Sequence, residues 1–156
     1  MTELRLDGKV LIVTGGTQGV GEAIARAAAD SGAAGILVTG RNRDRGARVA
    51  AVLARNGCAA HFHPAELGEE AQCRAVAAEA ERRFGHIDGL VNAAGLTDRG
   101  TLDGTTVELW ERLFNVNVYF QSYLPMTLDQ AAEIERWRKL GIRTVGAPPE
   151  PALLAP

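Results

Sequence analysis

The sequence is poor in several residue types that mark particular protein classes. Its 156 residues include only two cysteines, Cys58 and Cys73, and 5% aromatic residues, and the formal net charge is −2. Two isolated cysteines cannot build a disulfide framework, which favours a protein of the reducing cytoplasm. A net charge of −2 gives no indication of a basic surface that would bind nucleic acid. No apolar run is long enough to cross a bilayer. We therefore expect neither a nucleic acid nor a membrane as a partner.

Lysine is also scarce, and this scarcity bears on the chemistry. The lysines are Lys9 and Lys139, and the tyrosines are Tyr119 and Tyr123. A phenol titrates near pH 10, so it needs a nearby positive charge before it can exchange a proton near neutral pH. Only these two lysines could supply that charge as a side-chain ammonium group.

Glycine, in contrast, is abundant, and its most informative cluster lies near the N-terminus. An apolar run at 9–13 predicts a buried strand, and an alanine-rich stretch at 22–30 predicts a helix. The glycine-rich segment between them can turn sharply and let a pyrophosphate approach the backbone, at a helix N-terminus that favours anions. The expected phosphate contacts are Gly15, Thr17, Gln18, Gly19, Val20 and Gly21.

Strand and helix patterns alternate through most of the chain. Strands are expected at 9–13, 35–39, 59–63 and 87–92, and helices at 20–31, 43–55, 69–84 and 106–124, the last capped by Thr105. This order predicts the α/β class, with a Rossmann-like, doubly wound parallel sheet of four strands and a candidate short fifth at 142–145. We divide the chain into a dinucleotide-binding domain at 1–126, a divergent helix and strand at 127–146, and a proline-rich tail at 147–156.

The motifs together resemble those of the short-chain dehydrogenase/reductase family. The spacing of Gly15, Gly19 and Gly21 follows the family pattern Thr-Gly-x-x-x-Gly-x-Gly, and the segment 92–95 is similar to its Asn-Asn-Ala-Gly motif. Asn117 stands where the family has a catalytic asparagine. The resemblance covers about residues 5 to 118 and implies hydride transfer between a nicotinamide coenzyme and a carbonyl or alcohol. It also implies a longer sheet, so we expect a truncated form of the fold.

The end of the second expected strand bears on the choice of coenzyme. Gly40 and Arg41 stand where an acidic residue would select NAD(H) through its ribose hydroxyls. A guanidinium suits a 2′-phosphate, so the sequence favours NADP(H), with NAD(H) as the alternative. A second interpretation is that Arg41 is only a solvent-exposed side chain near the start of a helix and binds no phosphate.

The resemblance places further residues at the coenzyme. It puts Glu66 and Leu67 at the adenine, where the other interpretation of Glu66 is a solvated loop residue. It puts Asn92, Ala93 and Gly95 at the end of the fourth strand, where small residues let the coenzyme ribose approach.

Of the catalytic residues that the resemblance implies, only Asn117 can be placed. The family serine would fall near 144–147, where the only hydroxyl is that of Thr144. The resemblance also implies a catalytic tyrosine followed four residues later by a lysine, and neither Tyr119 nor Tyr123 is followed by one. We therefore expect the chain to be inactive alone, and Asn117 then makes a structural polar contact. The alternative function is a non-catalytic dinucleotide-binding or interaction module that forms a homodimer or docks on a complete homologue.

A metal site is also considered at the third expected strand. His61 and His63 alternate there, so they share one face, and Cys58 is near in sequence. No further ligand stands at a useful spacing, so we predict that no metal is bound there.

Overall fold

The computed structural model describes residues 5–98 and 100–119. Expectations for 120–156, including the strand at 142–145 and the proline-rich tail, lie outside the described residues. The elements in chain order are β1 (Val10–Thr14), α1 (Gly19–Asp30), β2 (Gly35–Gly40), α2 (Arg43–Arg55), β3 (Ala59–Pro64), α3 (Glu70–Phe84), β4 (Gly89–Asn92), a 3₁₀ turn η1 (Leu102–Gly104), α4 (Val107–Phe114) and a π-helix η2 (Asn115–Tyr119).

The four strands form one parallel sheet in the order β3-β2-β1-β4, which confirms the predicted α/β class. The chain runs from β1 outward to β3 and then returns to place β4 on the other side of β1. The strand order therefore reverses between β1 and β4. In open sheets of this kind, ligands bind at the carboxyl ends of the strands next to such a reversal.

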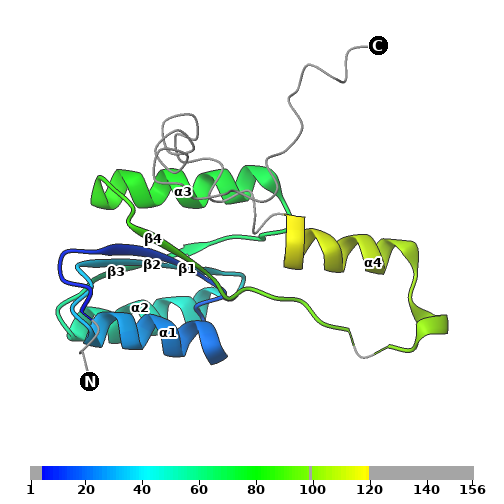
Figure 1. The fold of residues 1–156 in the computed structure, drawn as a ribbon, viewed down its shortest axis with the longest axis horizontal. Helices are drawn as coiled ribbons and strands as arrows, with labels where there is room; N and C mark the ends of the chain where they lie inside the picture. Colours follow the sequence, from blue (N-terminus) through cyan, green and yellow to red (C-terminus); the bar gives the residue numbers. More distant parts are fainter. Residues whose placement is uncertain (1–4, 99, 120–156) are drawn as a thin grey trace, which may run out of the picture.

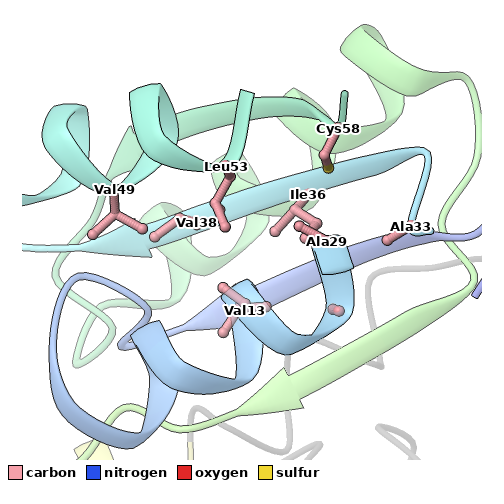
Figure 2. Close-up of a cluster of buried hydrophobic side chains, with 10 residues drawn as sticks. Val13, Ala29, Ala33, Ile36, Val38, Val49, Leu53 and Cys58 are labelled. Atoms are coloured by element: carbon pink, nitrogen blue, oxygen red, sulfur yellow. The ribbon is translucent and has the colours of Figure 1, made fainter. Parts of the chain in front are cut away.

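The two faces of the sheet are buried by different helices because strand side chains alternate with a period of two. Figure 1 shows α1 and α2 on one face and α3 on the other. Val13 and Val38 point to the first face, where they meet Val49 and Leu53 of α2 (Figure 2). The alternating strand residues Ile12 and Leu37 point to the α3 face. There they belong to a second cluster, with Ala65, Leu67, Cys73, Val76 and Ala80.

Asp88, just before β4, connects β4 to the start of β1. Its carboxylate accepts the Val10 N–H at 2.8 Å and the Lys9 ammonium at 3.0 Å. The Val10 N–H and then the Lys9 ammonium lower the pKa of Asp88 below its usual value. The carboxylate therefore fixes where β4 joins the sheet, more than seventy residues along the chain from β1.

The fourth helix differs from the expectation at both ends. It begins at Val107, and its cap is Thr106 rather than Thr105, because the Thr106 hydroxyl accepts the Leu109 N–H at 3.2 Å. The Thr105 hydroxyl instead donates to the Thr101 carbonyl. After Phe114 the chain continues as the π-helix η2, so no α-helix runs through to residue 119.

Figure 1 shows α4 beyond the carboxyl ends of the strands, away from both helix layers. None of its residues is buried. Its most exposed apolar side chains lie on one stripe, at Val107 (68%), Trp110 (60%), Phe114 (49%) and, in η2, Val118 (49%). The rings of Trp110 and Phe114 stack with their centroids 5.9 Å apart. In the described part of the chain, no helix is long and apolar enough to cross a membrane.

Candidate nucleotide-binding site

A cleft of about 400 Å³ opens at the carboxyl ends of the strands, where the strand order reverses. It is lined by every residue expected at the coenzyme except Asn92. These are Gly15, Thr17, Gln18, Gly19, Val20, Gly21, Arg41, Glu66, Leu67, Ala93 and Gly95. Asn92, the last residue of β4, is exposed but lies outside the lining. The structure thus brings together segments that are up to eighty residues apart in sequence.

The turn after β1 packs directly on the segment after β4. Gly15 has a φ of +63°, and a Cβ there would lie 2.6 Å from the Ala93 carbonyl oxygen and the Ala94 nitrogen. Only glycine fits at this point. Gly19 also has a positive φ, of +57°, but nothing lies within 4 Å of the place its Cβ would take. The backbone at Gly19 therefore leaves room for a ligand to approach closely.

Thr14 is a positioning residue whose role the sequence did not reveal. It is fully buried at the end of β1, and its hydroxyl accepts the N–H groups of Ala93 and Ala94 at 3.1 and 3.2 Å. The same hydroxyl donates to the Val91 carbonyl oxygen at 3.4 Å. One side chain thus holds the start of the glycine turn against the end of β4 and sets the floor of the cleft.

The N-terminus of α1 also faces the cleft. Its N-cap residue, Gln18, makes no side-chain hydrogen bond to the helix, and its amide oxygen instead accepts from the Arg45 guanidinium. The N-terminus of α2 is different, because the Asn42 side chain accepts the Arg45 N–H at 2.8 Å. The first N–H groups of α1 therefore have no side-chain cap, and the positive end of the helix dipole points at the cleft. This arrangement suits an anion.

Arg41 and Glu66 face each other at the other end of the cleft. The Arg41 Nη1 and the Glu66 Oε2 are 3.7 Å apart, and the two side chains are 60% and 40% exposed. The backbone N–H of Glu66 donates to the Gln72 side chain at 2.6 Å. Leu67, next along the chain, is buried in the α3 cluster, so it forms part of the cleft wall as a core residue.

Asn117 does not line the cleft, and its side chain is fully engaged elsewhere. Its amide oxygen accepts the Leu96 N–H at 3.0 Å, and its amide nitrogen donates to the Leu96 and Leu113 carbonyl oxygens at 2.7 and 2.9 Å. Both polar atoms of the amide are therefore used. In this structure Asn117 connects the segment after β4 to the end of α4, which is the structural polar contact considered from the sequence.

The residues considered for a metal site do not converge. Among the described residues, no three His, Cys, Asp or Glu side chains form a group that could hold a metal ion. His61 lies 3.0 Å from the Arg83 guanidinium, and burial and then Arg83 lower its pKa. Cys58 and Cys73 are buried free thiols, and burial raises the pKa of Cys73 to about 11. Neither thiol has the low pKa of a reactive cysteine.

The cleft also has lining residues that were not expected at the coenzyme. Gly40 is the last residue of β2, and Asn42 and Arg45 come shortly after it. The sequence signal for Asn42 is its position before a helix, where asparagine is a preferred cap. The others are Ala65, Ala94, Leu96, Thr97 and Val116. Leu96 and Val116 gave no signal, because the path of the loop between β4 and α4 decides their position.

The comparisons with known proteins agree with the motifs. The short chain dehydrogenase family model matches residues 9–135, so the chain belongs to the short-chain dehydrogenase family. The match extends past residue 118, where the motif resemblance ends. Among curated proteins, 2,3-dihydro-2,3-dihydroxybenzoate dehydrogenase of Bacillus subtilis is 37% identical over 112 residues, which are 72% of this chain and 42% of that protein.

Two solved structures have similar folds and different coenzymes. A short chain dehydrogenase from Burkholderia cenocepacia in complex with NADP has a TM-score of 0.77 and 31% identity, over 81% of this chain and 52% of that one. A short chain dehydrogenase/reductase from Burkholderia phymatum in complex with NAD has a TM-score of 0.75 and 28% identity, over 83% of this chain and 45% of that one. The chain thus spans about half the length of the relatives that it matches.

The hydrogen bonds of Thr14 can be tested with a matched pair of substitutions. We expect Thr14→Val to lower the free energy of unfolding by about 1–3 kcal/mol, because two buried N–H groups lose their acceptor. Thr39 is the control, since it is the register partner of Thr14 in β2 and is equally buried. Among the described residues its hydroxyl has no hydrogen-bond partner. Thr39→Val should therefore be neutral or stabilising by up to about 1 kcal/mol.

Urea denaturation of the two variants and the parent, followed by circular dichroism, measures these differences. Equal losses of stability in the two variants would contradict the assignment, because the hydroxyl bonds of Thr14 would then contribute nothing specific.

Proposed function

We propose that the chain is a coenzyme-binding short-chain dehydrogenase module that binds NADP(H) in preference to NAD(H). The observation that carries the proposal is the coincidence, in one cleft, of the glycine turn, the uncapped start of α1 and an arginine after β2. Hydride transfer between a nicotinamide coenzyme and a carbonyl or alcohol is the reaction of the family, and the nicotinamide supplies the hydride when it is bound.

The residues of the cleft fit the parts of such a coenzyme. The backbone N–H groups from Gly19 to Gly21 suit the pyrophosphate, since no side chain caps them and Gly19 leaves the approach open. Arg41 and Arg45 suit a 2′-phosphate beyond the end of β2. The small side chain of Ala93 and the absence of one at Gly95 leave space for a ribose at the end of β4.

The preference for NADP(H) is argued from the chain itself. Its structural neighbours include one complex with NADP and one with NAD, so the family does not impose a choice. No acidic side chain follows β2 directly, where Arg41, Asn42 and Arg43 stand. A dianionic 2′-phosphate gains from guanidinium groups here, whereas a neutral ribose hydroxyl gains much less.

The proposal does not extend to catalysis by this chain alone. The sequence contains no tyrosine followed by a lysine four residues later, and the side chain of Asn117 is already used in holding Leu96. The chain alone therefore binds the coenzyme without an acid–base group for the substrate. Its two cysteines are free and buried, which suits a reducing cytoplasm.

A second candidate function, an interaction module, is favoured by the exposed apolar stripe on α4. Val107, Trp110, Phe114 and Val118 are all about half or more exposed, and contiguous exposed apolar side chains often mark an interaction surface. Among the described strands, β4 lies at the edge of the sheet beside β1. Both features suit a homodimer or docking on a complete homologue.

Coenzyme choice is tested by titration of the purified chain. We expect NADPH to bind more tightly than NADH, and Arg41→Gln to weaken NADPH binding by about 10-fold or more, because a charge-assisted hydrogen bond is lost. NADH binding should change little. Isothermal titration calorimetry measures the four dissociation constants.

Arg74→Gln, on α3 outside the cleft lining, is the matched control for loss of one guanidinium. Equal affinity of the parent chain for both coenzymes would contradict the proposed preference.

Catalysis is tested with the same purified chain. We expect no oxidation of NADPH above background with generic ketones, since a positioned acid–base group is typically worth about 10²–10⁴-fold in rate. Absorbance at the nicotinamide band follows the reaction, with a complete family member as the positive control. Turnover that survives removal of host reductases would show that another group acts as the acid.

Assembly is tested through the apolar stripe on α4. We expect the parent chain to self-associate at micromolar concentration, and Trp110→Ser with Phe114→Ser to shift it toward monomer, because the pair supplies most of the aromatic surface of the stripe. Ile24→Ser, at a 36% exposed site on α1, is the control. A monomeric parent in sedimentation velocity would exclude self-association through this face.

A further inference from the structure

The positive charge of Arg41 lies next to the negative charge of Glu66 at one end of the cleft. Its guanidinium and the Glu66 carboxylate lie 3.7 Å apart, and both side chains line the main cleft. Both also line a second, neighbouring hollow of about 290 Å³, together with Arg43 and Gln72. The ion pair therefore stands where the two hollows meet.

The sheet brings the backbones of Arg41 and Glu66 close together, so their ion pair does not depend only on the length of the two side chains. Arg41 follows the last residue of β2, and Glu66 comes two residues after the end of β3. The two strands are parallel neighbours, and Gly40 pairs with Pro64. The Ala65 N–H donates to the Gly40 carbonyl oxygen at 3.1 Å, so the residues preceding the pair are themselves hydrogen-bonded.

The side chain of Gln72 holds Glu66 from the other side. Its amide oxygen accepts the Glu66 N–H at 2.6 Å, and its amide nitrogen donates to the Glu69 carboxylate at 2.6 Å. The backbone of Glu66 is thus held by α3 and its cap, and the carboxylate remains next to Arg41.

We propose that Glu66 is a specificity-determining residue that limits how strongly the chain prefers NADP(H). The inference rests on the proposed coenzyme site. A 2′-phosphate bound at Arg41 must share the guanidinium with the Glu66 carboxylate and is repelled by that carboxylate. The neutral 2′-hydroxyl of NAD(H) is not repelled, so Glu66 weakens NADP(H) binding selectively.

A role in adenine recognition alone would give a different result. The adenine is common to both coenzymes, so the loss of a carboxylate–adenine contact weakens both by the same factor and leaves their ratio unchanged. The ratio of the two dissociation constants therefore separates the two roles.

The test is the titration of the purified full chain and its Glu66→Gln variant with NADPH and NADH. We expect NADPH to bind about 3- to 10-fold more tightly to the variant, and NADH affinity to change by less than about twofold, because the charges involved are partly exposed. The gain should shrink between about 50 mM and about 500 mM salt, as screening increases. Glu81→Gln, which removes an exposed carboxylate of α3 outside the cleft lining, should leave the ratio unchanged.

A second comparison shows whether Glu66 acts through Arg41. In an Arg41→Gln background the gain from Glu66→Gln should be smaller than in the parent, since the shared guanidinium is gone. An unchanged ratio, or equal weakening of both coenzymes, would overturn the inference and leave the proposed site intact. A parent chain that binds neither coenzyme would overturn the proposed function, and the inference with it.

Discussion

The contact between the turn after β1 and the segment after β4 is the constraint on which the cleft depends. Thr14 supplies the hydrogen bonds of this contact, and Gly15 supplies the space, since a Cβ there would overlap Ala93 and Ala94. The contact sets the floor of the cleft. It also orients the start of α1, whose N–H groups then face the same space. The glycine turn and the segment after β4, which are far apart in sequence, thus line one cleft.

The sequence predicted the sheet and its three flanking helices because their signals are local and repeated. Strand residues such as Val13 and Val38 alternate with Ile12 and Leu37, and each set is buried by a different helix layer. The glycine turn and Arg41 followed from local sequence as well, whereas Glu66, Leu67, Ala93 and Gly95 were expected at the cleft only through the family resemblance. Thr14 was missed since nothing in its local sequence tells which N–H groups its hydroxyl will meet.

The fourth helix was harder to predict because its sequence carries two apolar stripes. Leu109, Leu113 and Val116 have helical spacing, and all three are half-buried. The more exposed stripe includes Trp110 and Phe114. Periodicity identifies both stripes equally, and only the path of the loop after β4, fixed by the bonds of Asn117 to Leu96, decides which one turns inward. The one-residue error in the cap has a similar origin, since Thr105 and Thr106 are both good caps.

At the end of the cleft formed by Arg41 and Glu66, two opposite charges act together, so neither residue alone sets the electrostatics. An arginine after β2 favours a 2′-phosphate, but the sheet register brings the Glu66 carboxylate within 3.7 Å of it. Since the two groups come from neighbouring strand ends, a sequence motif that records only the residue after β2 overlooks half of the electrostatics. In the coenzyme site that we propose, the choice of coenzyme depends on the pair of charges. The effect of an arginine at this position is therefore best judged together with the residue that follows the adjacent strand.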